Sequence, residues 1–367
     1  MWKLLFLVAA SLPLLLYEGP RKNSSKWGSG DTPEVSTPTR IVTWNVENQT
    51  KEISSSAQDK FYRILTELDA DVLALQEMRD AQSVAAIMQG VRGEFIWIID
   101  QNDSPRNLWF VIRTDRGVRF VSHPWQPNTS DLRIDAEKSN ITVYDADKSY
   151  FLFPDDNDLD DDDEDIISHE EYFPEFRDLL FVRLQIPGCD RDVIVINTHA
   201  KSRRWWRART DSRRVWAAQM AVDAIQARFP DCYVVFVGDF NDTPDCRSLQ
   251  ILETGGHDAQ PQLWDSSGEF VCNLTQHLAD ENHVSLGLSL SDTHENRLIT
   301  ITPGSQLRDF THTGTQAHTW DQLFDQILVS SALRNHFSLG DVWVCDMPAV
   351  LWKDVSDHQP VVAVFSP

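Results

Sequence analysis

Residues 233–244 read YVVFVGDFNDTP, an apolar run followed at once by acidic and amide residues. Five apolar residues come first, Gly238 interrupts the run, and Asp239, Asn241 and Asp242 follow. A short apolar run bounded by turn residues predicts a buried strand. Taken alone, the polar residues fit an ordinary Asp/Asn turn just as well. The remainder of the chain decides whether this strand end is functional.

Other predicted strands end in the same way. Residues 40–44 (RIVTW), 71–75 (DVLAL) and 192–196 (DVIVI) are apolar runs that stop at polar residues, and another polar pair precedes residues 361–365. Together these strand ends supply Asn45, Glu77, His199, Asp239 with Asn241, and Asp357 with His358. So regular a recurrence favours one shared site over several unrelated turns.

Helical spacing alternates with several of these runs. Apolar residues recur at helical intervals in residues 60–68, 83–88 and 211–227. Further strands are predicted at residues 95–99, 108–112, 118–122, 179–186 and 324–329. The alternation predicts an α/β fold in which the polar strand ends converge at one edge of the sheets.

The N-terminal segment predicts export. Residues 4–17 are apolar, a length that suits a secretory signal and is short for a membrane span. No clean small-x-small cleavage site follows, so residues 1–19 are a signal peptide or an uncleaved signal anchor. Residues 20–39 are rich in Ser, Gly, Pro and Lys and predict a disordered linker. We therefore expect a secreted or exported protein, with membrane anchoring through this segment as the alternative.

Sequons and cysteines are consistent with that expectation. Seven Asn-x-Ser/Thr sequons occur in the chain. Its five cysteines show no CxxC spacing, so one or two disulfides and a spare thiol are the expectation for an exported chain. Cys232 and Cys246 bracket the stretch 233–244 and are one candidate pair.

Much of the net charge of −23 is local, since residues 155–165 hold nine acidic residues out of eleven. Such a tract predicts a solvated insertion at about residues 154–171. A calcium loop is the alternative, but the Gly and Glu that an EF-hand requires at its sixth and twelfth positions are missing. The overall negative charge keeps the protein soluble and weakens any global attraction to nucleic acid.

The polar strand ends suit metal-assisted hydrolysis of a phosphate ester. Glu77, Asp357 and the amide oxygen of Asn45 are hard oxygen ligands, which Mg²⁺ or Mn²⁺ prefers. His199 and His358 can polarise a phosphate oxygen, and Asp239 can accept a proton from water. Each residue has an ordinary structural explanation on its own, but the complete set does not.

Six motifs in order carry a family resemblance: TWNVEN, LQE, NTHAKS, GDFND, DQILVS and SDHQP. They resemble the signature of the endonuclease/exonuclease/phosphatase family, whose members resemble deoxyribonuclease I and the abasic-site endonucleases. The match runs from about residue 40 to residue 367. The resemblance implies one catalytic domain with an α/β fold of two packed β-sheets flanked by helices, a four-layer sandwich.

The resemblance also implies roles for the site residues. Glu77 would be the principal metal ligand, aided by Asn45 and Asp357, and Asp239 would orient or deprotonate the attacking water. The phosphate would be contacted by three side chains, those of Asn241, His199 and His358, and Asp325 would orient His358. Glu47 stands where some relatives carry a second acidic group, a position that varies among them.

Residues 201–214 bear on the substrate, because seven Lys or Arg fall within fourteen residues, together with two Trp. Arg contacts phosphates and Trp stacks on bases, so the run favours a nucleic acid held by Lys201, Arg203, Arg204 and Arg207. The alternatives are a solvated helix start with packed Trp residues, or a basic segment that neutralises the acidic insertion.

The leading hypothesis is an exported, monomeric, Mg²⁺- or Mn²⁺-dependent nuclease or phosphodiesterase, with no protein partner evident. One alternative is a phospholipid phosphodiesterase of sphingomyelinase type, or a phosphatase, at a membrane surface. Another is a catalytically inactive binding module, which the complete set of site residues disfavours.

Overall fold

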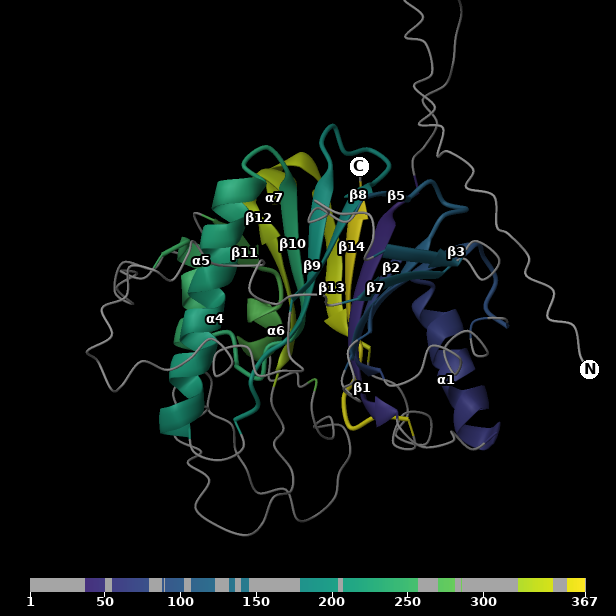
Figure 1. Ribbon diagram of the computed structural model, residues 1–367, viewed down its shortest axis with the longest axis horizontal. Coiled ribbons are helices and arrows are strands. Elements are labelled where there is room, and N and C mark those ends of the chain that lie inside the picture. The colour runs from purple at the N-terminus through teal and green to yellow at the C-terminus, as the bar shows by residue number, and fades with distance from the viewer. Residues whose placement is uncertain are drawn as a thin grey trace, which may run out of the picture. The chain divides into compact units, whose positions relative to one another are not determined.

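Two β-sheets carry the fold of the computed structural model, which is shown in Figure 1. The structure describes residues 37–49, 55–78, 88, 90–101, 107–122, 132–135, 140–144, 179–203, 207–256, 270–280, 285, 323–345 and 355–366. The predicted signal or anchor segment, the linker through residue 36, the acidic insertion and most of the helix predicted at 83–88 lie outside these ranges. Among the described residues, no helix is long and apolar enough to cross a membrane.

The first sheet has eight strands in spatial order. They are β13 (Ser338–Val344), β14 (Val361–Ser366), β1 (Thr39–Gln49), β2 (Val72–Met78), β4 (Asn107–Arg113), β3 (Phe95–Gln101), β7 (Asn140–Tyr144) and β6 (Leu132–Asp135). The second sheet has six strands: β11 (Val271–Asn273), β12 (Asp325–Ser330), β10 (Tyr233–Asp239), β9 (Val193–His199), β8 (Leu179–Gln185) and β5 (Arg119–Ser122).

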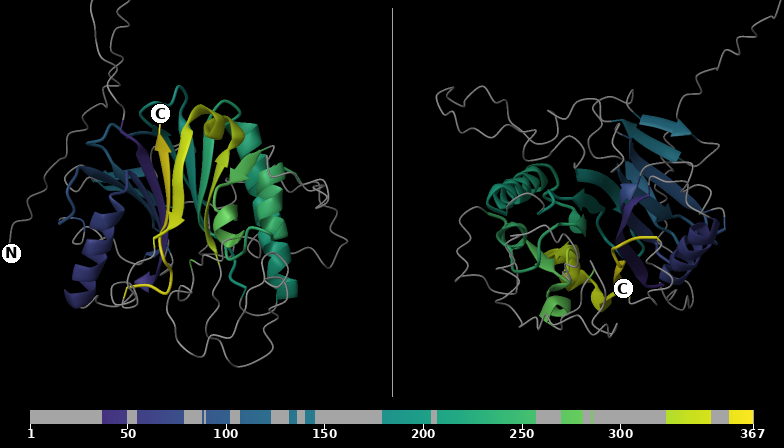
Figure 2. Two further views of the ribbon diagram at one scale, coloured as in Figure 1. Left: turned by 180° about the vertical axis from the view of Figure 1, so that it is seen from behind. Right: turned by 90° about the horizontal axis from the view of Figure 1, so that it is seen from below.

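Helices cover the outer faces of both sheets, as the two views of Figure 2 show. Helix α1 (Ser55–Leu68) packs on the first sheet, and α4 (Arg207–Arg228) and α5 (Arg247–Thr254) pack on the second. Two shorter helices, α6 (Gln276–Asp280) and α7 (Ser331–His336), complete the helices of the described ranges. The predicted four-layer α/β sandwich of two packed sheets flanked by helices is confirmed.

Apolar side chains alternate along the strands to fill three layers of core. The central layer joins Ile41, Val72 and Phe110 of the first sheet to Val195 and Val235 of the second. The outer layers hold the apolar faces of α1 and of α4 with α5. Full burial of each such side chain contributes roughly 1.5–3 kcal/mol, so the sheets stay together by their inner faces.

Strand direction brings the polar ends together. Strands β1 and β2 run parallel, and so do β9 and β10, so their carboxyl ends share one edge. Strand β12 runs antiparallel to β10, which sets its first residue, Asp325, opposite Asp239. Strand β14 runs antiparallel to β1, so Val361 pairs with Thr43 and the segment before β14 reaches the same edge.

Most of the predicted elements exist with extended boundaries. Helix α1 begins at Ser55 instead of residue 60, and α4 begins at Arg207 instead of residue 211. Strands β6, β7, β11 and β13 and the short helices α5, α6 and α7 were not predicted from the sequence. These elements are three to eight residues long, too short for periodicity to be distinct.

Gly238 allows β9 and β10 to approach closely just before the polar strand end. Its φ is +142°, and a Cβ atom there would lie 2.0 Å from the main-chain oxygen of Thr198. Any other residue would push β10 away from β9. The glycine that interrupts the apolar run therefore sets Asp239 directly beside His199, its partner in the strand register.

Candidate active site

Asp239 lies at the centre of the converging strand ends and is almost fully buried. Its Oδ2 accepts a hydrogen bond of 2.9 Å from Nδ2 of Asn45, and its Oδ1 accepts one of 2.8 Å from the main-chain N–H of Asn241. Burial raises the pKa of Asp239 to about 6, with Asp325 also raising it, while His358 and the two hydrogen bonds lower it. A carboxylate with a pKa near neutrality is suited to accept a proton.

His358 is also buried, and Asp325 holds it by a hydrogen bond of 2.7 Å between Nδ1 and Oδ2. Burial alone would lower the pKa of His358, but the charges and the hydrogen bond of Asp325, together with Asp239 and Asp357, raise it to about 10. At neutral pH the ring is therefore an imidazolium, with both nitrogens as donors. Its Nε2 lies 3.6 Å from Asp357 Oδ1 and 4.0 Å from Asp239 Oδ2.

Ser356 links the His358 loop to strand β1. Its hydroxyl donates to the main-chain oxygen of Asn45 and accepts from the main-chain N–H of His358, at 2.6 and 2.9 Å. The indole N–H of Trp44 donates to the main-chain oxygen of His358 at 2.9 Å. Asn45 and His358, more than three hundred residues apart in sequence, are thus fixed to one another through their backbones.

Glu77 reaches the site through an unusual backbone conformation. Leu73 and Leu75 alternate toward α1, so regular alternation would aim Glu77 away from the second sheet. Its φ of 58° and the register shift between Leu75 and Met78 redirect it. Its Oε1 lies 3.5 Å from Nε2 of His199. Backbone strain of this kind, in a non-glycine residue, is typical of functional sites.

His199 lies between two carboxylates. Its Nε2 is 3.5 Å from Glu77 Oε1 and 3.5 Å from Asp239 Oδ2, and the side chain is 1% exposed. Asn241 completes this part of the site, also with a positive φ, of 51°. Its Nδ2 donates to the main-chain oxygen of Ala200 at 3.0 Å, which joins the two loops that follow β9 and β10.

The charge balance of this group suits a bound cation. The carboxylates of Glu77, Asp239, Asp325 and Asp357 surround two imidazoles, so an anionic ester meets excess negative charge even with both rings protonated. Asn45 donates through Nδ2 to Asp239, so it would ligate a metal through Oδ1. No group of three or more His, Cys, Asp or Glu side chains in the described ranges is arranged as a closed metal cluster. A few oxygen ligands with the rest supplied by water is how Mg²⁺ is usually held.

The structure brings together the eight residues predicted as catalytic or metal-binding. Asn45, Glu77, His199, Asp239, Asn241, Asp325, Asp357 and His358 are joined by the contacts described above. Five of them come from strands β1, β2, β9, β10 and β12, and three from the loops beside β10 and β14. The side chain of Glu47 lies outside the described part of the chain.

The predicted substrate-binding arginines need a correction. Arg203 is buried and pairs with Asp242, with Nη2 at 2.8 Å from Oδ1, so it is not a surface contact for substrate. Lys201 is half-buried, and its role stays a prediction. Arg204 and the side chain of Arg207 lie outside the described residues. The basic run does not act as a single surface patch.

The candidate disulfide is also corrected. Cys232 and Cys246 are not joined by a disulfide, and each is a free thiol. Cys246 instead accepts a hydrogen bond from Arg203 Nη2 at 2.9 Å.

Sequence reasoning missed two buried amides that join the sheets directly behind the site. Asn197 Nδ2 donates to the main-chain oxygens of Leu75 and Trp109, at 2.9 and 3.0 Å, and its Oδ1 accepts from Gln76 at 2.7 Å. Gln76 and Asn197 stand one and two residues before Glu77 and His199. An amide inside an otherwise apolar run was the signal that could have identified them.

Comparison with solved structures gives relatives at low identity. The structure of humanized D. rerio TDP2 carrying 14 mutations has a TM-score of 0.54 at 16% identity and covers 90% of this chain and 99% of that one. The D. rerio TDP2 complex with a single strand DNA product has a TM-score of 0.53 at 15% identity, covering 90% and 100%. An endonuclease/exonuclease/phosphatase from Bacteroides vulgatus has a TM-score of 0.52 at 13% identity, covering 90% and 99%.

These likenesses show the fold. No curated protein sequence matches the chain significantly. The family profile described as Endonuclease/Exonuclease/phosphatase family matches residues 42–358, which include all the site residues gathered at the strand ends. The chain therefore belongs to the endonuclease/exonuclease/phosphatase family.

Proposed function

We propose that this chain is a Mg²⁺- or Mn²⁺-dependent phosphodiesterase that cleaves nucleic acid. Members of its family are hydrolases of phosphodiesters and phosphate esters and are typically metal-dependent. The observation that carries the proposal is the buried Asp239 carboxylate, held by Asn45 and Asn241 within 4.0 Å of both His199 and His358. One proton acceptor beside two imidazoles is what in-line attack of water on a phosphate ester requires.

Asp239 orients the attacking water and accepts its proton, for which its raised pKa is suited. His358 donates from Nε2 to a nonbridging phosphate oxygen, because Asp325 keeps it charged and fixed through Nδ1. Asn241 and His199 bind the remaining phosphate oxygens. These donors are already in place before substrate arrives, so little reorganisation accompanies the reaction.

Glu77, Asn45 through Oδ1, and Asp357 would hold the metal ion. When bound, the ion supplies positive charge to the scissile phosphate. Glu77 carries this role best, because its strained backbone turns its carboxylate into the site. The half-exposed Asp357 would complete the ligand set from the side of His358.

Two observations support a nucleic acid as substrate. The D. rerio TDP2 structure contains a single strand DNA product, although its likeness to this chain extends only to the fold. Residues 201–214 remain rich in basic residues after the buried Arg203 and Arg214 are set aside, with Lys201, Arg204 and Arg207 as the proposed phosphate contacts. We propose export on the strength of the apolar residues 4–17 and the sequons.

A substrate panel tests the proposed function. The purified full-length chain is incubated with duplex DNA, single-stranded DNA, RNA, sphingomyelin, a phosphomonoester and an inositol phosphate, each with Mg²⁺, with Mn²⁺ and with EDTA. We expect nucleic-acid cleavage that EDTA abolishes and either ion restores. Cleavage that persists in EDTA would overturn the metal assignment, and hydrolysis of sphingomyelin alone would replace the nuclease with a phospholipid phosphodiesterase.

A further inference from the structure

Two arginines of the basic run 201–214 point inward, around one buried carboxylate. Arg203 Nη2 lies 2.8 Å from Asp242 Oδ1, and Arg214 Nε lies 2.8 Å from Asp242 Oδ2. The three side chains are between 1% and 6% exposed. Ser248 of α5 donates to the same carboxylate. We call Arg203, Asp242 and Arg214 the ion cluster.

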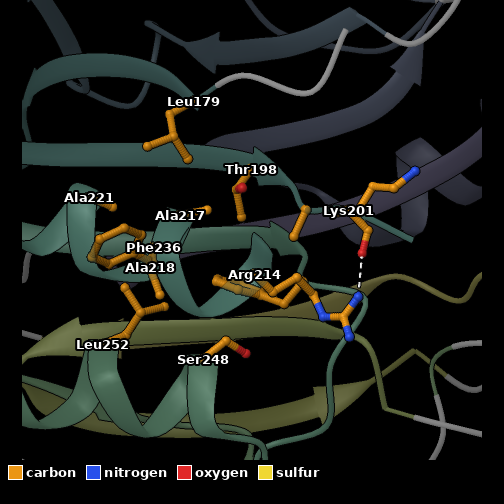
Figure 3. Close-up of a pocket in the computed structure, with 12 residues that line it drawn as sticks. Leu179, Thr198, Lys201, Arg214, Ala217, Ala218, Ala221, Phe236, Ser248 and Leu252 are labelled. Atoms are coloured by element: carbon orange, nitrogen blue, oxygen red, sulfur yellow. Dashed lines mark hydrogen bonds between the residues drawn. The ribbon is translucent and has the colours of Figure 1, made fainter. Parts of the chain in front are cut away.

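The ion cluster ties together segments that each adjoin a site residue. Arg214 Nη1 donates at 2.7 Å to the main-chain oxygen of Lys201, two residues after His199, as Figure 3 shows. The guanidinium of Arg203 lies over the ring of Phe324, 5.0 Å from the ring centroid. Phe324 directly precedes Asp325. Asp242 itself follows Asn241. The exits of β9 and β10 and the start of β12 are therefore fixed through one cluster.

Asn241 has a left-handed backbone with a φ of 51°, which Asn tolerates better than most L-residues. The contacts of its neighbour Asp242 hold this conformation in place. Its neighbour Asp242 is held at the carboxylate by the two arginines and at the main-chain oxygen by Gln326 Nε2, at 2.6 Å. Asn241 in turn binds the main-chain oxygen of Ala200. Loosening Asp242 would release both Asn241 and the loop after His199.

The electrostatics favour a permanent structure over a switch. Burial alone would raise the pKa of Asp242, but Arg214 and Arg203 lower it below its ordinary value, so the carboxylate stays ionised at neutral pH. Removing one member of a buried ion pair leaves an uncompensated charge, which is strongly destabilising. Because both buried guanidiniums need the Asp242 carboxylate to balance their charge, the three side chains keep one fixed arrangement.

We infer that the ion cluster is a positioning device for the reaction: Arg203 and Arg214 act through Asn241 and the loop after His199, not by contacting nucleic acid. The inference rests on the proposed function, in which Asn241 and His199 bind the phosphate. A shift of about 1 Å in such groups is enough to cost on the order of a hundredfold in rate. Arg203 and Arg214 are thus buried arginines that hold the site, whereas Lys201 and Arg213 are only partly buried.

The test replaces Arg214 by Lys, which keeps the charge but loses the forked head that reaches Asp242, Lys201 and Asp211 together. Arg113→Lys is the matched control. Arg113 also binds two carboxylates through its forked head, those of Asp69 and Asp115, and is largely buried (9% exposed, against 2% for Arg214), but it lies at the end of β4 opposite the site. Steady-state cleavage of single-stranded DNA with Mg²⁺ and hydrogen exchange of the backbone amides are measured for both.

We expect Arg214→Lys to lower kcat by about tenfold to a hundredfold with KM within about twofold, and Arg113→Lys to leave kcat unchanged. Exchange of the Ala200 and Asn241 amides should accelerate in Arg214→Lys alone. Unchanged kcat and exchange in folded Arg214→Lys would overturn the inference. A raised KM with a flatter salt dependence would instead make Arg214 a nucleic-acid contact.

If Arg214→Lys does not fold, a milder variant supplies the test. Ser248→Ala removes one hydrogen bond to Asp242 and should produce the same pattern at about a few-fold in kcat. If the parent protein cleaves no phosphodiester, the proposed function fails, and amide exchange alone then decides whether the ion cluster holds the two loops. Slow, unchanged exchange in both variants would reject it.

Discussion

At the scale of single residues, Asp239 differs from an ordinary strand-end Asp in its neighbours. Asn45 and the main chain of Asn241 each donate one hydrogen bond to it, and two imidazoles lie within 4.0 Å. Those partners hold the carboxylate in one orientation. The carboxylate is thus already oriented for the reaction before a substrate binds. Its burial makes the folded protein less stable, since burial disfavours the charged form.

Asp239→Asn should lower phosphodiester cleavage by about a hundredfold or more, because the amide cannot accept a proton from water. Initial rates on single-stranded DNA provide the measurement. Asp231→Asn, at the exposed turn before β10, is the control and should retain full activity. Near-normal rates in Asp239→Asn would remove Asp239 from the mechanism.

The pKa values of Asp239 and His358, about 6 and about 10, predict a bell-shaped dependence of kcat on pH. Activity should rise as Asp239 loses its proton and fall at alkaline pH as His358 loses its own. Asp325→Asn removes the charge that raises the pKa of His358, so the alkaline limb should move to lower pH. A profile whose alkaline limb is identical in this variant would show that Asp325 does not control His358.

At the scale of elements, strand directions explain why the sequence pattern was informative. Parallel β1 with β2 and parallel β9 with β10 must end together, so polar residues after those apolar runs meet. The antiparallel strand β12 contributes its first residue, Asp325, to the site. Only the family resemblance predicted a role for this residue. Asp325 is the first residue of its strand, so the pattern of polar residues after apolar runs did not identify it.

Other features could not be predicted because they depend on tertiary contacts. The burial of Arg203 arises from Asp242, thirty-nine residues away, and the local sequence reads as an exposed basic run. The turn of Glu77 into the site depends on a backbone conformation that its neighbours in sequence do not specify. The free thiols of Cys232 and Cys246 likewise follow from packing, because proximity in sequence does not bring them together.

Gly238→Ala tests the approach of β9 and β10. The new Cβ would lie 2.0 Å from the main-chain oxygen of Thr198, so the strands must separate. We expect the free energy of unfolding to fall by about 3 kcal/mol or more, measured by urea denaturation. Gly256→Ala is the control, because a Cβ there meets nothing within 4 Å. Equal stability of the two variants would contradict the strand geometry described for β10.

At the scale of the whole molecule, the site is shared between the sheets. Asn45, Glu77 and His358 belong to the first sheet and its final loop, whereas His199, Asp239 and Asp325 belong to the second. Asn197 and Gln76 bridge the sheets immediately behind these residues. Neither sheet alone carries a working set of groups.

In urea, the loss of activity and the change in tryptophan fluorescence should therefore occur together, as one transition. Asn197→Leu should shift both midpoints down equally, because two main-chain oxygens lose their donor at a cost of about 1–3 kcal/mol each. Val195→Ala, on the same strand, is the control that reduces core packing and keeps the bridge. Loss of activity well below the fluorescence midpoint would show that the site opens independently of the sheets.

The pairing of β14 with β1 also bears on the order of events during biosynthesis. Residues 361–366 insert between β13 and β1, and His358 lies three residues before this strand begins. A nascent chain still lacking this segment on the ribosome has neither the imidazolium nor the neighbour that β1 needs. The set of site residues can consequently be complete, and held by β14 in its place beside β1, only after translation has passed residue 366.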